Sequence, residues 1–262
     1  MKTLLICHKG AGLSRTGLSR WLASFSQLVG IIEIEEDRGR IFKRIKREVK
    51  RVGPIRFLDV IAFRFYYKIF LSRNDAEWES KMLDRLVEEY PGLSVDVPVL
   101  TTNSPISEKA EEFISSRQPE LMVVRCKSLL KESIFSKPSK GSFVMHPGIC
   151  PEYRNAHGCF WALVNSDMKN VGMTLLKIDN GVDTGPIYGY YSYPFDEVVE
   201  TPFVIQNRVV LENLHTLKEK LLEIFHGNAS PIDSSGRPTH VWGQPWLTAY
   251  LKWRKDAKRR NK

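Results

Sequence analysis

Residues 141–164 read GSFVMHPGICPEYRNAHGCFWALV, and residues 179–189 read DNGVDTGPIYG. The apolar run Ser142–Met145 predicts a buried strand that ends at His146, because the proline that follows cannot continue a hydrogen-bonded ladder. The second stretch predicts a tight loop that carries Asp183 between two glycines. Ligands of open α/β sheets bind at the carboxyl ends of the strands, so His146 stands at a candidate site.

The residue types at these two positions suit proton transfer. Imidazole titrates near neutral pH, and a nearby carboxylate fixes its tautomer and raises its basicity. A histidine at a strand end and an aspartate in a turn are also ordinary structural features, because D-x-G is common turn chemistry. The residues alone leave both interpretations open.

The order of the motifs resembles the folate-dependent formyltransferase family. Residues 146–154, HPGICPEYR, are similar to that family's H-P/G-S-L-L-P-x-x-R segment, and residues 155–157, NAH, are similar to the glycinamide ribonucleotide transformylase branch. Residues 172–174, GMT, resemble the G-x-T strand, and residues 181–187, GVDTGPI, resemble the D-x-G loop. The resemblance spans roughly residues 1–200.

The resemblance implies a fold and a reaction. The expected fold is α/β, with a Rossmann-like, mainly parallel twisted sheet and helices on both faces. The expected reaction is transfer of a formyl group from 10-formyltetrahydrofolate to an amine of a small or sugar-nucleotide-like acceptor.

The resemblance also implies residue roles. His146 would remove or relay the proton of the amine and stabilise the intermediate, and Asp183 would hold and polarise His146. The donor would contact two loops through Arg125, Cys126, Lys127, Leu129, Val182, Thr184 and Gly185. An anionic group of the acceptor would meet Lys9, Gly10 and Gly12, and further oxyanion or substrate contacts would come from Arg154, Asn155 and His157.

One position departs from the family pattern, which places an asparagine two residues before the histidine. Here that residue is Val144. The asparagine donates a hydrogen bond to the oxyanion, and loss of such a donor costs on the order of a hundredfold or more in rate. Two alternatives therefore stay open: a hydrolase of formyl-folate, and a weakly active or inactive relative that binds folate or a sugar. Asn155 is a candidate substitute donor, or only the N-cap of a helix over residues 156–164.

The rest of the chain fits one α/β domain over residues 1–200, interrupted by a helical insertion at about residues 38–90. Residues 201–262 would be a C-terminal helix and a basic tail packed on the same domain. Within them, hydrophobic periodicity predicts one long helix, Glu200–Phe225, and the tail from residue 254 onward is expected to fray. Further strands are predicted over Thr3–Cys7, Val29–Glu35, Val95–Leu100, Pro119–Val124 and Val171–Ile178.

Composition restricts the partners. The 262 residues carry a net charge of +9, so an anionic partner is expected. The chain has no apolar run of membrane-span length, no recognisable signal peptide and no C-x-x-C spacing, which favours a cytoplasmic protein without a bound metal. The basic insertion is either a solvated helical face or, through residues 38–71, a contact with an anionic membrane. Nucleic-acid binding is not expected, because no nucleic-acid module accompanies the charge and the tail is too short for a tRNA-binding barrel.

Overall fold

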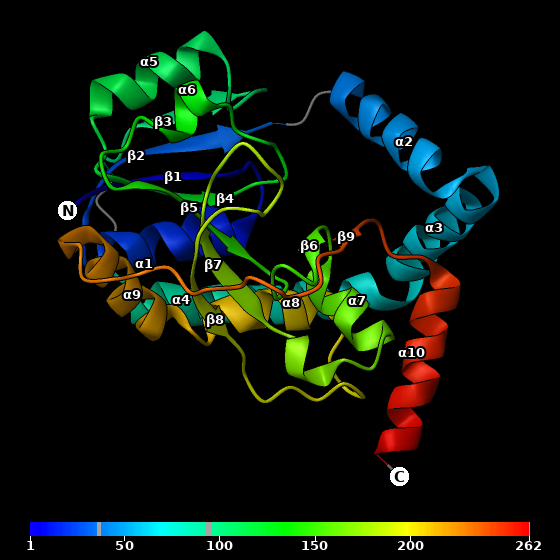
Figure 1. The fold of residues 1–262 in the computed structure, drawn as a ribbon. Coiled ribbons are helices and arrows are strands. Elements are labelled where there is room, and N and C mark those ends of the chain that lie inside the picture. The colour runs from blue at the N-terminus through cyan, green and yellow to red at the C-terminus, as the bar shows by residue number, and fades with distance from the viewer. Residues whose placement is uncertain (36–37, 93–95, 262) are drawn as a thin grey trace.

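The computed structural model describes residues 1–35, 38–92 and 96–261, and its centre is a seven-stranded sheet (Figure 1). The strand order is β3-β2-β1-β4-β5-β7-β8. Pairing is parallel from β3 through β5, whereas β7 and β8 are antiparallel to their neighbours. The bounds are β1 Lys2–His8, β2 Gln27–Ile34, β3 Val99–Thr102, β4 Leu121–Arg125, β5 Gly141–His146, β7 Met173–Lys177 and β8 Ile187–Tyr191. The predicted α/β class with a mainly parallel sheet is confirmed.

The central strands form because their apolar runs are buried on both faces. Residues 3–7 of β1 and 121–124 of β4 are buried without interruption, as expected for parallel strands covered by helices on both sides. The predicted strands match within a few residues, except that β3 begins at Val99 and not at Val95. Residues 93–95, where that prediction began, lie outside the described part of the chain.

Helices cover both faces of the sheet (Figure 1). One face packs against α5 and α6, and the other packs against η1, α1, α4, α7, α8 and α9. The bounds are η1 Leu13–Leu18, α1 Ser19–Ala23, α4 Ser72–Glu89, α5 Glu108–Arg117, α6 Glu132–Phe135, α7 Gly158–Val164, η3 Met168–Asn170, α8 Pro202–Leu211 and α9 Leu214–His226.

The single long helix predicted over Glu200–Phe225 is wrong, because the segment forms α8 and α9 with a break at Asn213. This residue has φ −109° and ψ 14°, outside helical geometry. Its side-chain amide donates to the carbonyls of Ser192 (3.1 Å) and Val209 (2.8 Å). An asparagine that bonds to nearby backbone competes with the helical pattern, and hydrophobic periodicity alone does not register that competition.

The predicted fraying of the basic tail is also wrong for the residues described. Helix α10 runs over Leu247–Arg260, and its Trp253 is fully buried. Arg260 donates to both carboxylate oxygens of Glu197, at 2.9 and 2.7 Å, and these bonds hold the pKa of Glu197 below its usual range. Lys262 lies outside the described part of the chain.

The predicted basic insertion is helical. Its predicted range, at about residues 38–90, holds α2 Arg38–Val52, α3 Pro54–Tyr66, η2 Tyr67–Leu71 and then α4. Helices α2 and α3 extend away from the sheet, and α10 lies beside α3 (Figure 1). In the described ranges, no helix has both the length and the apolar composition that a bilayer crossing requires.

Candidate active site

The structure brings His146 and Asp183 together. His146 is the last residue of β5, and Asp183 lies in the loop between β7 and β8. The His146 Nδ1 atom is 3.5 Å from Asp183 Oδ2, and the two side chains are 6% and 15% exposed. Two titratable groups, thirty-seven positions apart in the chain, therefore share one largely buried place at the carboxyl edge of the sheet.

Hydrogen bonding fixes the tautomer of the neutral His146 ring. Its Nε2 atom is 2.8 Å from the carbonyl oxygen of Tyr153. A carbonyl oxygen can only accept, so Nε2 carries the hydrogen and Nδ1 carries the lone pair. The free lone pair therefore stands beside the Asp183 carboxylate. A proton taken up at Nδ1 would lie between the ring and that carboxylate.

The loop before β8 presents Asp183 in a fixed position. Asp183 has φ +51°, in the left-handed region that aspartate tolerates better than most residues. Its Oδ2 also accepts the Asn155 backbone N–H at 2.8 Å. Earlier in the loop, the Asp179 carboxylate accepts from Gly181 N (2.9 Å) and from the Thr184 hydroxyl (2.8 Å). Because Asp179 accepts these hydrogen bonds within the turn, the Asp183 carboxylate is not needed for them and can face the histidine.

The segment after His146 packs so closely that glycine is required. A Cβ on Gly148 would lie 2.5 Å from Tyr153 O and 2.7 Å from His146 Nε2. The facing Gly158 is equally tight, with its own virtual Cβ 2.5 Å from Gly148 Cα. Two glycines thus allow the chain to fold back over the imidazole and to bring the Tyr153 carbonyl to Nε2.

A segment near the C-terminus covers this loop, which the sequence did not predict. Strand β9 (Val241–Trp242) pairs in parallel with β6 (Arg154–Asn155). The Trp242 ring stacks between Tyr153 and Trp161, with centroid distances of 5.7 and 5.0 Å. Burial of such aromatic surface fixes the loop, because each ring contributes a large apolar area.

An ion pair adds to this attachment. Arg237 donates from Nε (2.9 Å) and Nη2 (2.7 Å) to the two carboxylate oxygens of Glu152. Both side chains are largely buried, and a two-point arginine–carboxylate pair is the strong form of this interaction. The only hint in the sequence was a cluster of tryptophans among glycines and prolines, which indicates a loop but not its partner.

Asn155 and His157 have structural contacts near the site. The Asn155 side-chain amide donates to the Trp242 carbonyl, so the helix N-cap interpretation of Asn155 is wrong. His157 takes the position before α7 with φ +57°. Burial and the nearby Lys127 charge lower the pKa of His157 to about 4, so this ring is neutral at physiological pH.

The loop after β4, predicted to hold the donor, lies at the neighbouring strand end. Arg125 donates to the Met145 carbonyl (2.8 Å) and to Asn207 Oδ1 (3.2 Å), and its burial lowers its pKa to about 10. The Lys127 N–H donates to His8 Nε2 at 2.9 Å, and the Cys126 thiol donates to the Ser128 carbonyl. The Leu129 side chain is 61% exposed and offers apolar surface beside these polar groups.

The glycine loop after β1 lies at the same edge. Lys9 pairs with Glu35 at 3.1 Å, and both side chains are exposed. Gly10 has φ +78°, and a Cβ placed on it would have no described residue within 4 Å, whereas a Cβ on Gly12 would meet Leu83 of α4. The bond from Lys127 N–H to His8 ties this loop to the loop after β4.

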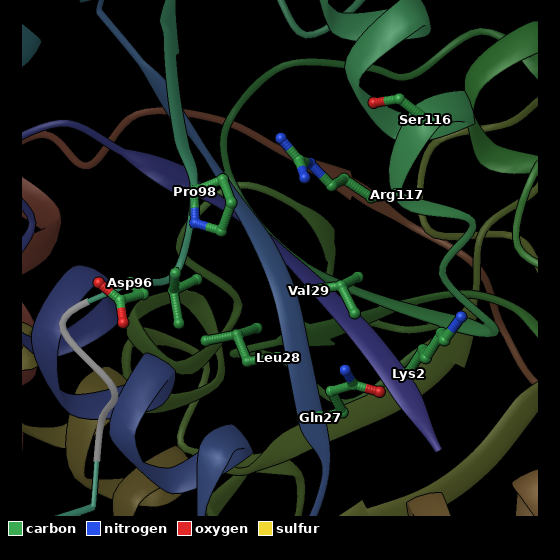
Figure 2. Close-up of a pocket in the computed structure, with 9 residues that line it drawn as sticks. Lys2, Gln27, Leu28, Val29, Asp96, Pro98, Ser116 and Arg117 are labelled. Carbon is green, nitrogen blue, oxygen red and sulfur yellow. The ribbon is translucent and has the colours of Figure 1, made fainter.

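The hollow in Figure 2 is at the other end of the sheet. It is lined by Lys2, Gln27, Pro98, Arg117 and their neighbours, at the starts of β1 and β2. This edge is remote from the carboxyl strand ends that carry His146, so the hollow belongs to no part of the candidate site.

Comparison with known proteins identifies the family. The sequence pattern of the formyl transferase family matches residues 73–221, more than half of the chain and the part that contains His146 and Asp183. The chain belongs to the formyl transferase family. The predicted resemblance is thereby confirmed.

Curated relatives share part of this chain. It is 30% identical over 132 residues to the methionyl-tRNA formyltransferase of Kosmotoga olearia, a match that covers 49% of the chain and 37% of that protein. It is 26% identical over 129 residues to the GDP-perosamine N-formyltransferase of Brucella melitensis, covering 49% of each protein. The matches thus span about a third to a half of the length of these formyl transferase relatives.

Solved structures agree with the fold. A sugar N-formyltransferase from a Shewanella species superposes with a TM-score of 0.56 at 16% identity, covering 93% of this chain and 77% of that one. Phosphoribosylglycinamide formyltransferase from Anaplasma phagocytophilum gives a TM-score of 0.54 at 13% identity, with coverage of 94% and 99%. At such low identity the likeness supports the Rossmann-like formyl transferase fold alone.

Val144 sets this member of the formyl transferase family apart from the pattern that the sequence resembles. The side chain is partly buried against the cluster formed by Cys150, Leu176 and Ile187, and valine has no side-chain hydrogen-bond donor. The suggested substitute, Asn155, already donates its side-chain amide to Trp242. In the described ranges, no three His, Cys, Asp or Glu side chains gather in a group that could hold a metal ion.

Proposed function

We propose that this protein transfers a formyl group from 10-formyltetrahydrofolate to an amine of a small or sugar-nucleotide-like acceptor. The observation that carries the proposal is the 3.5 Å approach of His146 Nδ1 to Asp183 Oδ2 in a chain of the formyl transferase family. The nature of the acceptor rests on the likeness to GDP-perosamine N-formyltransferase and, in fold, to sugar N-formyltransferases.

His146 would act as the base at Nδ1. The acceptor nitrogen would bond to the formyl carbon and give its proton to Nδ1. While it is charged, the imidazolium would donate from Nδ1 to Asp183 and from Nε2 to the Tyr153 carbonyl. It would then pass the Nδ1 proton to the carrier nitrogen as the bond between that nitrogen and the formyl carbon breaks, so that the carrier leaves as a neutral amine. Both hydrogens of the charged ring would face oxygen acceptors, which stabilises the charge where it develops.

The loop after β4 has groups that suit a folate carrier. The carrier supplies the activated formyl group, and its flat ring needs an apolar wall beside polar atoms. The exposed Leu129 side chain, next to Cys126 and Lys127, offers that combination. Val182, Thr184 and Gly185 would close the other side of the ring from the Asp183 loop. Lys127 and Arg125 are cations that suit the acidic end of the carrier.

Acceptor contacts would come from Arg154 and from the loop with Lys9, Gly10 and Gly12. Arg154 Nη1 donates to the Val182 carbonyl at 3.2 Å, while its Nε is a buried donor that has no acceptor among the described residues. A buried guanidinium nitrogen left unpaired costs free energy, so an acceptor oxygen at that place would be stabilising. Lys9 would add a positive charge for a phosphate.

A second candidate function follows from Val144. Val144 cannot supply the hydrogen bond that the family's asparagine donates, and one of the two N–H groups of the Asn155 side-chain amide is already bound to the Trp242 carbonyl. Such a protein could bind folate or an amino sugar while transferring the formyl group slowly. Hydrolysis of the donor by water is the third outcome, since the same base can activate water.

One experiment separates these functions. The protein is incubated with 10-formyltetrahydrofolate and a panel of amino-sugar nucleotides, glycinamide ribonucleotide and methionyl-tRNA, and mass spectrometry detects the formylated acceptor. Formate release without any acceptor would indicate a hydrolase. Binding of a stable donor analogue by calorimetry, without either product, would indicate a binding protein. Absence of both turnover and donor binding would refute the proposal.

A further inference from the structure

The arm formed by α2, α3 and η2 has an exposed apolar stripe. Ile55, Leu58, Phe65 and Ile69 follow one another at spacings of three, seven and four residues, which places them along one side of a helix. Their exposed fractions are 85%, 65%, 64% and 69%. The buried residue of α3, Val60, lies on the opposite side and faces the protein. The arm therefore has two apolar faces, and only one is covered by the described residues.

Exposed cations surround this stripe. Lys68 immediately precedes Ile69 and is exposed, whereas Arg64 lies on the side of the protein body and donates to Gln244 at 3.5 Å. The adjoining helix α2 adds Lys46, Arg47 and Lys50, all exposed. Among the described residues, the acidic side chains of the arm are already engaged: Glu48 pairs with Arg51, and Asp59 pairs with Arg56. The surface is thus apolar in its centre and positive around it.

We propose that this arm binds the surface of an anionic lipid membrane, with the stripe Ile55, Leu58, Phe65 and Ile69 in the boundary between headgroups and acyl chains. Helices with an aromatic and aliphatic face and flanking Lys and Arg bind in this way, because apolar burial and attraction to anionic headgroups add together. Long lysine and arginine side chains reach the headgroups while their stems lie along apolar surface.

Other kinds of binding partner would suit either the cations or the apolar stripe of this surface, but not both. A nucleic acid would neutralise the cations but would leave the apolar stripe in water, since phosphates and sugars offer little apolar cover. A second copy of the chain would cover the stripe but would bring two sets of cations together, at a net charge of +9 per chain. A lipid surface covers both kinds of residue at once.

The arm is firmly attached to the body of the protein. Phe63 and Tyr66 pack their rings on Tyr250 of α10, at 5.4 and 5.5 Å. The Asp59 carboxylate accepts the Thr248 N–H at 3.1 Å, and the Arg56 guanidinium lies over the Trp246 ring. These contacts lead to the segment that covers the candidate site. Membrane binding would therefore hold the site at a fixed distance from the lipid surface.

The arm is also separate from the part of the chain that identifies the family. The family match begins at residue 73, after η2. The proposal therefore does not depend on the proposed transfer reaction, and failure of either leaves the other standing.

The test is co-sedimentation of the full-length protein with vesicles. We expect at least about tenfold stronger binding to phosphatidylcholine vesicles with about one-third phosphatidylserine than to phosphatidylcholine alone, and a steep loss in high salt. The double variant Phe65→Glu with Ile69→Glu should lose about tenfold or more of this binding. Both side chains are more than half exposed, so circular dichroism and thermal unfolding should match the wild type.

Matched controls define the outcome. Val199→Glu with Ile232→Glu makes the same change at exposed apolar residues elsewhere and should bind as the wild type does. Lys46→Gln with Lys68→Gln should weaken binding, unlike Lys109→Gln with Lys169→Gln. Equal binding to both vesicle types, or equal binding by the Phe65 and Ile69 variant, would overturn the proposal. A dimer lost in that variant, or oligonucleotide binding without vesicle binding, would overturn it as well.

Discussion

Replacement of Asp183 by asparagine isolates the carboxylate charge beside His146. Asparagine has the same shape, tolerates the left-handed φ of +51° and can still accept the Asn155 N–H. The backbone and the loop should therefore stay in place. Alanine would be a poorer choice, because it would add strain at this φ and leave the Asn155 N–H without its acceptor.

The distance sets the size of the effect. Two charges 3.5 Å apart interact by about 5 kcal/mol at an effective dielectric constant of about 20. Solvent reaches part of the Asp183 side chain, so we expect about 3 to 4 kcal/mol, which corresponds to a 10²-fold to 10³-fold loss in kcat. The KM for the donor should change less than about threefold, because the charge acts on the transition state and not on binding.

The assay is steady-state formyl transfer to whichever acceptor the panel identifies. Asp179→Asn is the matched control, since Asp179 lies in the same loop and bonds to Gly181 and Thr184 without facing the imidazole. It should lose less than about tenfold, because its amide oxygen still accepts one of those bonds. If Asp183→Asn keeps its rate within about threefold while unfolding at the wild-type temperature, His146 does not depend on that charge and the proposed mechanism is refuted.

Four further outcomes are expected. Gly148→Ala should abolish transfer and lower the melting temperature, because its Cβ would lie 2.7 Å from the His146 ring; normal turnover would contradict the packing. His157 has a folded-state pKa of about 4 against about 6.5 unfolded, so the unfolded state takes up more protons as pH falls. Wild-type stability should drop by about 2 kcal/mol between pH 7 and pH 5, and denaturant titrations of His157→Asn should show a flatter profile. Arg237→Lys should cost about 1 to 2 kcal/mol of unfolding free energy, since lysine cannot make the two-point bond to Glu152. Val144→Asn should raise kcat about tenfold or more if the missing oxyanion donor limits the rate, and an unchanged kcat would show that another group already fills that place.

Much of the fold could be predicted because local pattern and tertiary environment agree. Residues 121–124 are apolar, two of them are β-branched valines, and they form most of a central strand that is buried on both faces. The end of β5 at His146 followed from the proline behind it. Gly227 takes the left-handed conformation directly after α9, as expected of a glycine at the C-terminal end of a helix.

The failures share a physical cause, which is that side-chain partners far away in sequence decided the outcome. Asn213 breaks a helix through a bond to Ser192, and the basic tail is ordered because Arg260 finds Glu197. Hydrophobic periodicity gives no information about either of these partners, Ser192 or Glu197. A run of charged residues predicts fraying only where no buried carboxylate is close enough to pair with them.

The candidate site, like the fold, could be predicted only where the local sequence carries the signal. Chain order and motif chemistry placed His146 and Asp183 at neighbouring loops, and the structure brings them within 3.5 Å. The groups that hold the His146 ring in place were not predicted. The carbonyl of Tyr153, seven residues after His146, fixes the ring, and Trp242 stacks against Tyr153. Removal of this stacking should therefore disturb the tautomer of His146 without any change at the imidazole or at Asp183. The C-terminal segment is thus part of the catalytic apparatus that we propose, because it holds in place the one oxygen that decides which nitrogen of His146 carries the proton.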